Sequence, residues 1–570
     1  MNDDLKQSIL SVLEASLDAQ LRAVRRLRKG DTGAPRPSRR SGLSQVDMAY
    51  DVLKKARAPL HVSALLARIK TSFSVAVDRE SLVSSLSKKV ARGGPLPAHR
   101  QEHLRLAPGG SMTLLATFLE IVADWRPVFP QQRTFLRAVR QALGSLVCLG
   151  RRCLSRILWT WGGQNRSWSG EYFLHSRCQW QPQQLFAPIL RRALDYCPGR
   201  LVGVAIDDTR LPKTGRCIPQ AFYQRDPLSP PFHVNIQLGL RFLQASLLVP
   251  LHRAAKAGAR ALPIRFEEVS RVKKPGRKAK PEDWKAYKLA VKRHNLSQRF
   301  VEMMSHLRQS LDDAGGNKKL LVLAGDGSFC NRTCFRATRD RTEWIARARK
   351  DAVLCFQAPP DSRRFYAIDK FTPDQVRQDE SRDWKETKLF YGGKRRKVRY
   401  KEVARVFWQG GAGRIPLRLI VVAPTPYRKR KSNKKYYRRP AFLLTTDLKS
   451  SVKQLLQIYF DRWQIEVNHR DEKDTLGVGQ AQLWNVNAVP QQPVLVVAAY
   501  SALLLASLQA FGTERGSAYA PLPKWRRNAH RPSCLDLIAL LRTEMVKHPE
   551  LIKDFDLKIN DQGLTRAAAA

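Results

Sequence analysis

The sequence predicts an α/β fold, because short apolar runs typical of buried strands alternate with longer segments of helical periodicity. The runs 201–206 and 320–324 have the length and composition of strands, and each leads directly into acidic residues. Residues 284–311 and 459–473 carry helical patterns. Open α/β sheets bind ligands at the carboxyl ends of their strands. The same pattern that predicts the fold therefore also predicts where a site would lie.

The helical segment 459–473 places four chemically distinct side chains on one stripe. Tyr459, Arg462, Glu466 and Lys473 stand at offsets of 0, 3, 7 and 14 residues. At about 100° per residue these offsets fall within roughly 60° of each other. One carboxylate would then stand among an aromatic hydroxyl and two cations, which suits a metal ligand beside phosphate-binding groups. The alternative is a solvated amphipathic helix with mixed charges.

Two strand ends supply further carboxylates. The run 201–206 leads into Asp207 and Asp208, and the run 320–324 leads through a glycine into Asp326. Three acids from three separate elements, counting Glu466, are thus expected to converge on one site. Between the two strand ends, residues 232–251 are expected to form two more strands joined by a turn near Gly239.

The segment 459–473, with the blocks Ile206–Gly215 and Ala324–Ser328, resembles the DDE transposases of bacterial insertion sequences. The resemblance is to the group marked by a Tyr-x2-Arg-x3-Glu-x6-Lys signature, whose spacing is met in full, and it covers roughly residues 115–545. It implies a core like that of ribonuclease H with a β-rich insertion, preceded by an α-helical region.

The resemblance also implies a chemistry, which is phosphoryl transfer at DNA. Two divalent ions, Mg²⁺ or in its place Mn²⁺, would be held by three carboxylates, here assigned to Asp208, Asp326 and Glu466. Asp208 is chosen because it directly precedes Thr209, as the catalytic acid of the family does. Asp207 is the alternative first ligand. Because strand pleating sends the two aspartates to opposite faces, we do not expect both of them to bind one ion.

By the same resemblance, several basic and aromatic residues would contact the terminal phosphates of the transposon end. These are Tyr459, Arg462 and Lys473, with Arg347 and Arg349 as an extension. The implied enzyme binds double-stranded transposon ends, cleaves them through a hairpin, and joins the 3′ ends to target DNA as a homodimer. The alternatives are a catalytically silent DNA-binding regulator and a two-metal nuclease without strand transfer.

Composition independently favours a nucleic-acid partner. Lys and Arg number 101 against 49 Asp and Glu, so the formal net charge is +52. Such a surplus favours phosphate binding with a strong salt dependence. The nine cysteines show no paired spacing typical of zinc sites or disulfide frameworks, so we expect a reduced, cytoplasmic protein. The resemblance to bacterial transposases implies that it is associated with the nucleoid. The uncharged stretch 493–511 is expected to be a buried helix and not a membrane span.

The amino-terminal region predicts a separate DNA-binding module. Three short helical patterns and a possible hairpin between residues 44 and 108 resemble a HARE-type winged helix-turn-helix, whose third helix, 78–90, would approach the major groove. A protein-interaction module is the alternative.

The expected organisation of the whole chain has seven parts. They are a helical and basic linker (1–43), the winged helix-turn-helix (44–108), a helical DNA-binding region (109–198), the first part of the core (199–356), the β-rich insertion (357–447), the second part of the core with the glutamate helix and the following helix (448–513) and a basic helical tail (514–570).

Overall fold

The computed structural model of the protein divides into two compact units, 1–103 and 104–570. The residues described are 113–557 with gaps at 227–228, 231, 252–257, 338–339, 429–433, 526–528 and 530, together with Val52, Leu66 and 69–72. In the first unit Val52, Leu66 and 69–72 are helical, and Ile69 is fully buried. The rest of the predicted linker and winged helix-turn-helix lies outside the described residues.

The second unit is built on a mixed ten-stranded sheet with the strand order β2-β3-β1-β5-β6-β14-β11-β10-β9, in which β4 pairs with β3. β1 pairs antiparallel with β3 and parallel with β5, and β5 pairs parallel with β6. The strands β4-β3-β1-β5-β6 form the predicted core like that of ribonuclease H. Their bounds are β1 (Leu201–Pro212), β2 (Phe222–Arg225), β3 (Ile236–Val249), β4 (Arg260–Glu268), β5 (Leu320–Gly325) and β6 (Thr342–Arg347).

Four strands of the region 357–447 continue this sheet, while β7 with β8 and β12 with β13 form two separate two-stranded sheets. β14 pairs antiparallel with β6, with Leu443 opposite Arg347, and β11, β10 and β9 follow outward. The insertion and the core therefore share one sheet. The bounds are β7 (Leu354–Gln357), β8 (Tyr366–Phe371), β9 (Lys385–Tyr391), β10 (Lys394–Val406), β11 (Leu417–Val422), β12 (Pro426–Tyr427), β13 (Tyr436–Tyr437) and β14 (Ala441–Thr445), with α13 (Pro373–Gln378) among them.

The turn expected near Gly239 is wrong, because β3 runs through this residue without interruption. Gly239 stands opposite Pro212 of β1, and a Cβ at position 239 would lie 2.7 Å from the carbonyl oxygen of Leu211. Gly239 therefore allows β3 to pack closely against the backbone of β1, and it does not form a turn.

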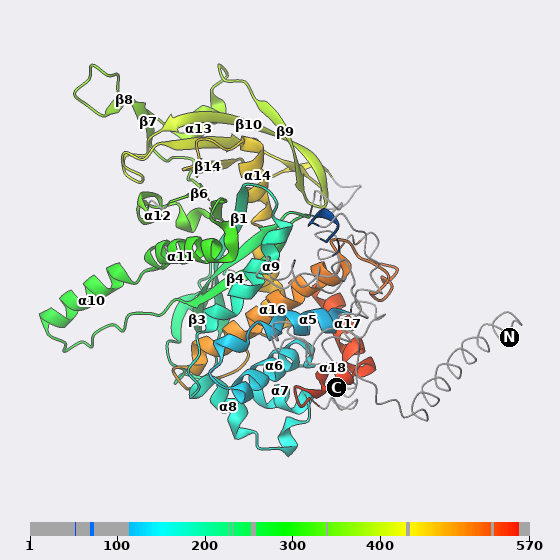
Figure 1. Ribbon diagram of the computed structural model, residues 1–570. Helices are drawn as coiled ribbons and strands as arrows, with labels where there is room; N and C mark the ends of the chain where they lie inside the picture. Colours follow the sequence, from blue (N-terminus) through cyan, green and yellow to red (C-terminus); the bar gives the residue numbers. More distant parts are fainter. Residues whose placement is uncertain are drawn as a thin grey trace, which may run out of the picture. The chain divides into compact units, whose positions relative to one another are not determined.

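Helices cover the sheet and extend from it (Figure 1). The expected helix 284–311 is two helices, because the side chain of Asn295 caps the second by accepting from the Gln298 amide. The first, α10, buries none of its residues and projects from the body. The bounds are α5 (Leu114–Ala123), α6 (Gln132–Val147), α7 (Leu154–Thr160), α8 (Ser169–Ser176), α9 (Phe186–Ala193), α10 (Pro281–Arg293), α11 (Leu296–Leu311) and α12 (Arg332–Arg336).

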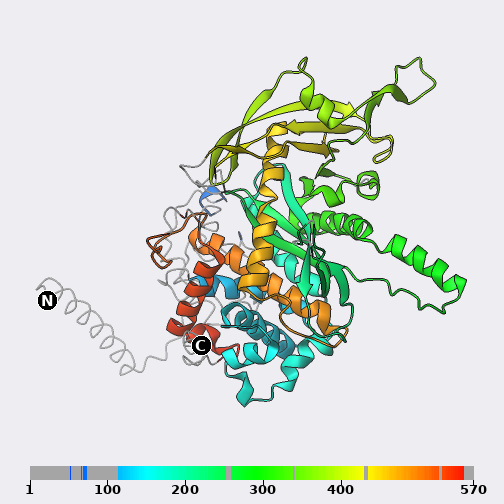
Figure 2. The same ribbon diagram turned by 180° about the vertical axis from the view of Figure 1, so that it is seen from behind.

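The carboxyl-terminal helices complete the fold. They are α14 (Val452–Asp461), α15 (Gln464–Arg470), α16 (Ala488–Phe511), α17 (Cys534–Lys547) and α18 (Glu550–Lys553). Figure 2 shows α14 and α15 crossing the sheet one after the other. By length and composition α16 would be able to cross a membrane, but most of it is buried against other elements such as α5 and β4, so 493–511 is confirmed as a buried helix.

Candidate active site

Asp207 and Asp208 lie within β1, which continues to Pro212, so the strand end expected at residue 206 is wrong. The two aspartates have different surroundings. Asp208 forms an ion pair with Arg241 of β3, with 2.7 Å between Oδ2 and Nε. The Oδ1 atom of Asp207 accepts a hydrogen bond from the Asp208 amide at 2.9 Å. Since successive strand residues point to opposite faces, only one of the two carboxylates faces the helix that crosses this sheet.

Asp326 lies beside Asp207 at the same edge of the sheet. β1 and β5 are parallel, with Ala205 opposite Ala324. Asp207 lies two residues after Ala205 within β1, and Asp326 lies two residues after Ala324, directly beyond the end of β5. The carboxylate of Asp326 accepts from the amide of Ser328 at 2.9 Å and from its hydroxyl at 3.1 Å. Burial and then the negative charge of Asp326 raise the pKa of Asp207 to about 7, and the charge of Arg462 opposes this rise.

Glu466 in α15 faces the same space. Its Oε1 atom accepts from Arg462 Nη2 at 3.3 Å. Burial raises the pKa of Glu466, Arg462 opposes this effect, and Asp326 adds to it. Asp326 therefore acts on both Asp207 and Glu466, and Arg462 acts on both as well. Asp326 is thus near both Asp207 and Glu466, and the carboxylates repel each other.

Close packing holds the helix that carries Glu466 over the sheet. Gly203 of β1 leaves room for Ile458 of α14, because a Cβ at position 203 would lie 3.1 Å from the Ile458 side chain. Further along, Gln244 of β3 donates to Glu472 at 2.9 Å. Gln244 is also the residue opposite Asp207 in the β1–β3 pairing. The same pair of strands thus positions both the first aspartate and the helix above it.

The segment 459–473 is not the single helix that the sequence predicts, because Arg462 and Trp463 form a turn between α14 and α15. α14 ends at Asp461, and the Glu466 amide donates to the carbonyl oxygen of Trp463 at 3.2 Å, a tighter spacing than in an α-helix. Residues 471–475 then form a π-helical turn. Tyr459, Arg462 and Glu466 still share one face, whereas Lys473 follows on the wider turn.

Four of the five predicted phosphate contacts lie on or near this face, and one does not. The Arg462 guanidinium lies 5.9 Å from the ring centre of Tyr459. Burial raises the pKa of Tyr459, and the charges of Arg462 and Arg347 oppose the rise, which places Arg347 close by. Lys473 and Arg462 both add to the effect of burial on His469, whose pKa is lowered to about 3. Arg349 instead pairs with Asp351 at 2.6 Å, and its side chain is 84% exposed.

The carboxylates offer the hard oxygen atoms that divalent cations such as Mg²⁺ prefer. Asp207 and Glu466 are partly buried acids whose pKa values are raised in part by the charge of Asp326, and a bound cation would remove this repulsion. Within the described part of the chain, no three His, Cys, Asp or Glu side chains are gathered tightly enough to enclose an ion. The oxygen atoms of Asp207, Asp326 and Glu466 are suitable ligands for a divalent ion. To enclose the ion, these three side chains would have to approach each other more closely.

The matching family model is that of the DDE superfamily endonucleases, and it covers residues 127–414. The chain belongs to this family. The matched residues include Asp207, Asp208 and Asp326 and stop before Glu466. Among curated proteins nothing matches the chain. Membership in a DDE endonuclease family supports an enzyme of the nuclease or transposase type that acts on DNA and uses divalent metal ions.

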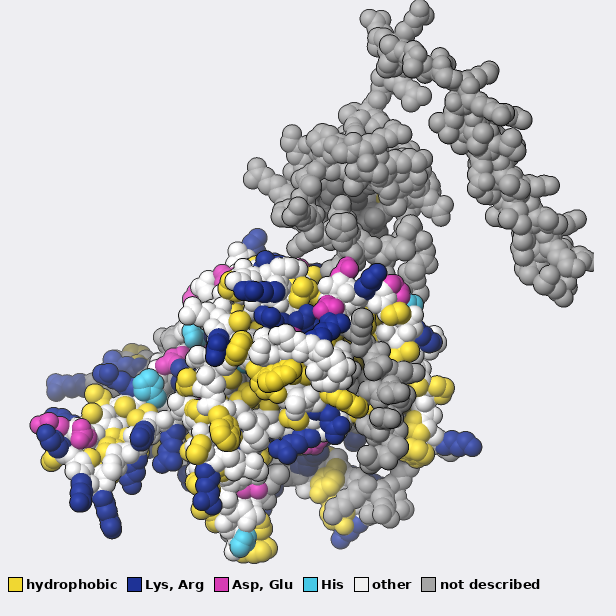
Figure 3. Space-filling model, turned by 90° about the horizontal axis from the view of Figure 1, so that it is seen from below, with side chains coloured by type: hydrophobic (Ala, Val, Ile, Leu, Met, Phe, Trp, Pro, Cys, Tyr) yellow, Lys and Arg dark blue, Asp and Glu magenta, His cyan; other side chains and the backbone are white. Residues whose placement is uncertain are grey.

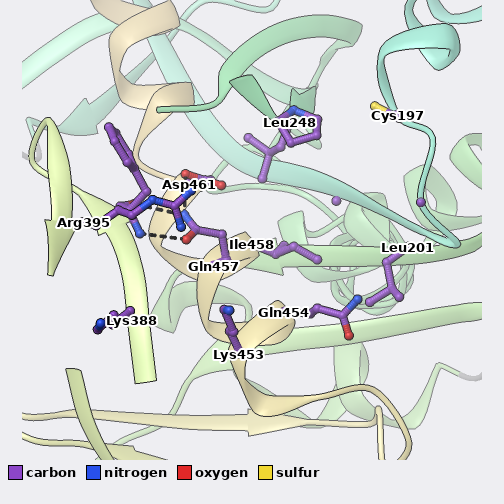
Figure 4. A pocket seen from close by; sticks show the side chains of 14 residues that line it. Cys197, Leu201, Leu248, Lys388, Arg395, Lys453, Gln454, Gln457, Ile458 and Asp461 are labelled. Carbon is purple, nitrogen blue, oxygen red and sulfur yellow. Dashed lines mark hydrogen bonds between the residues drawn. The ribbon is translucent and has the colours of Figure 1, made fainter. Parts of the chain in front are cut away.

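A cavity of this DDE endonuclease lies away from Asp207, Asp326 and Glu466. It has a volume of about 380 Å³ and is lined by Leu201 and Gly203 near the amino end of β1, whereas Asp207 lies in the middle of that strand. Figure 4 shows Lys388 and Arg395 from the insertion facing Lys453 of α14 across it. Basic side chains also predominate over acidic ones on the face drawn in Figure 3.

Proposed function

We propose that this DDE endonuclease is a transposase, which cleaves DNA at the ends of its own element and joins the 3′ ends to a target. The observation that carries the proposal is the environment of Arg462. Its buried Nε atom has no hydrogen-bond partner among the described residues, while its Nη2 atom donates to Glu466. A buried donor without an acceptor is costly, and a DNA phosphate beside the carboxylates would satisfy it.

We assign the metal-binding role to Asp207, Asp326 and Glu466. Asp207 replaces Asp208 in this proposal, because Asp208 is held by Arg241 whereas Asp207 interacts with Asp326 and Arg462. Two divalent ions, Mg²⁺ or Mn²⁺, would activate the attacking water or 3′ hydroxyl and would stabilise the leaving oxygen. The chain's own contribution is to orient the three carboxylates from two adjacent strands and one helix.

The basic residues around the carboxylates would position the scissile phosphate. Arg462 offers a fork of donors beside the Tyr459 ring, and the charge of Arg347 at the end of β6 also opposes the rise that burial causes in the pKa of Tyr459. Lys473 adds a point charge at the far end of the segment. We keep the hairpin intermediate and the DNA-bridging homodimer as parts of this proposal. Arg349 is left out of the phosphate-binding set, because Asp351 already neutralises it.

The test is incubation of the purified full-length protein with labelled DNA that carries its candidate terminal repeats, in Mg²⁺ or Mn²⁺. Wild type is compared with Glu466→Gln and Asp207→Asn. Joined strand-transfer products that disappear in both variants, while end binding persists, support the transposase. Cleavage without joined products identifies a two-metal nuclease, and binding without cleavage by the wild type identifies a silent regulator.

A further inference from the structure

We propose that a second, arginine-lined cavity behind α15 is a binding site for a phosphate group. The cavity has a volume of about 160 Å³ and lies between β4, α15, α16 and the start of α17. Three arginines line it, Arg260, Arg470 and Arg531, against a single acid, Asp471. A phosphate oxyanion is the ligand that such a surplus of guanidinium groups recognises.

Arg260 is the central residue of this site. Its residue exposure is only 6%, and its Nη2 atom donates to the carbonyl oxygen of Pro532 at 2.7 Å. Its Nε atom has no partner among the residues described. A buried cation with an unsatisfied donor is destabilising unless something compensates it. An anion in the cavity that Arg260 lines would provide both the acceptor and the opposite charge.

The charged residues next to Arg260 also favour binding of an anion in the cavity. Arg531 donates to Ala259 O at 2.8 Å and to Gln464 Oε1 at 2.7 Å, so it is held rigidly at the cavity. Burial and then the charge of Arg260 lower the pKa of Arg531 to about 10, which shows that the two cations repel each other. The one acid is already shared, since Asp471 accepts from Tyr500 at 3.1 Å and from Arg470 at 3.2 Å. An oxyanion between the arginines would relieve the repulsion.

The cavity is distinct from the active site but uses the same helix. Gln464, Asn468 and Asp471 line it from one side of the α15 segment. Glu466 stands two residues from Gln464 and also two from Asn468, which is about 200° around a helix, so it faces away from the cavity. The first turn of the 14-residue helix α17 begins at the cavity with Ser533 and Cys534, and helix amino termini favour anions. A bound phosphate would therefore contact and stabilise α15 on the face opposite Glu466.

The experiment uses the full-length protein without DNA or metal, and its probe is inorganic phosphate. Thermal unfolding is followed at increasing phosphate, with sodium chloride adjusted to keep ionic strength constant. We expect a saturable rise in Tm for wild type. The apparent Kd should weaken at least tenfold in Arg531→Gln and in Arg470→Gln, whose side chain is 64% exposed and whose loss leaves the core intact.

The matched control is Arg349→Gln, which removes one exposed arginine far from this cavity in sequence and outside its lining. It should keep the wild-type response to phosphate. A response that is absent in wild type, or equal in all four proteins, would overturn the proposal, because it would reflect a general ionic effect.

A second measurement distinguishes free phosphate from the DNA backbone as the natural source. The affinity for a labelled duplex of arbitrary sequence is measured at several salt concentrations for wild type and Arg470→Gln. A slope of log K against log salt reduced by about one indicates that a DNA phosphate occupies the site. An unchanged slope, together with the lost response to inorganic phosphate, indicates a free phosphate ligand. Neither outcome depends on transposase activity, so this proposal can fail or succeed separately.

Discussion

At the scale of single residues, the chemistry of the site depends on which neighbour each carboxylate meets. Asp207 and Asp208 are adjacent in sequence, yet one interacts with Asp326 and the other with Arg241. The reason is the pleat of β1, which turns successive side chains to opposite faces. Chemically identical groups thus have different expected roles.

The first prediction separates these two aspartates. Asp207→Asn should reduce DNA cleavage by on the order of 10²–10³-fold or more, since an electrostatic group of the active site is removed. Asp208→Asn should retain most cleavage and cost about 1 kcal/mol of stability, because only the partly buried ion pair with Arg241 is lost. Cleavage rates and denaturant midpoints of both variants provide the measurement. Loss of cleavage in Asp208→Asn alone would return the metal-binding role to Asp208.

The second prediction concerns a buried acid outside the active site. Burial raises the pKa of Asp461 from its ordinary 3.8 to about 7, and its Oδ1 atom accepts from Gln457 at 3.1 Å. Because the folded-state pKa is raised, the stability from this group is fully present below pH 3.8 and is lost as pH rises through about 7. Asp461→Asn stays neutral, so its stability relative to wild type should increase with pH.

The gain of Asp461→Asn should reach at most about 4 kcal/mol above pH 7, which corresponds to the difference between the two pKa values. Denaturant unfolding at pH 5 and pH 8 measures it. A constant difference between the two proteins across this range would show that Asp461 is charged in the folded state at both pH values.

At the scale of elements, the glutamate helix depends on how closely α14 approaches β1. We predict that Gly203→Ala lowers stability by about 1–3 kcal/mol, because the new Cβ would lie 3.1 Å from Ile458 and force the helix or its side chain to move. DNA cleavage should fall as well, since the displaced helix carries Tyr459 and leads into Arg462. Gly276→Ala is the matched control, as nothing lies within 4 Å of its Cβ position. Equal effects of the two substitutions would contradict this account.

At the scale of the whole molecule, the net charge of +52 is concentrated partly on elements that bury little of their own surface. α10 buries no residue, and Lys285, Lys288 and Lys292 stand at offsets of 0, 3 and 7 along it. These offsets place the three ammonium groups on one side of the helix. The helix and its surplus of cations suit contact with a DNA backbone.

We therefore predict that replacing these three lysines by glutamine weakens binding to DNA of any sequence. The slope of log K against log salt should decrease by up to about 3, because each phosphate contact releases roughly 0.9 counterion. Unfolding temperature should change little, since α10 buries none of its side chains. Fluorescence anisotropy at several salt concentrations measures the slope. An unchanged slope would place the DNA elsewhere on the molecule.

The features that the sequence predicted correctly are encoded over short stretches. Hydrophobic periodicity located β1, β5, the segment of α14 and α15, and the buried helix α16, because each pattern reports only its own element. The α/β class followed from these elements in order, whereas the core like that of ribonuclease H was implied by the family resemblance. The winged helix-turn-helix stays a prediction, and so does the assignment of the signature residues to transposon ends.

What the tertiary structure alone decided depends on residues that are distant in sequence. Strand pleating predicts that the side chains of Asp207 and Asp208 point to opposite faces of the sheet. Only the position of α15 over one of these faces decides which aspartate interacts with Arg462. The continuity of core and insertion rests on the pairing of β14 with β6, and Gly239 resembles a turn residue until β1 is seen against it. The cavity behind α15 gathers Arg260, Arg470 and Arg531, which no local pattern connects. Local periodicity determines elements, whereas facing side chains and shared cavities arise only when those elements pack.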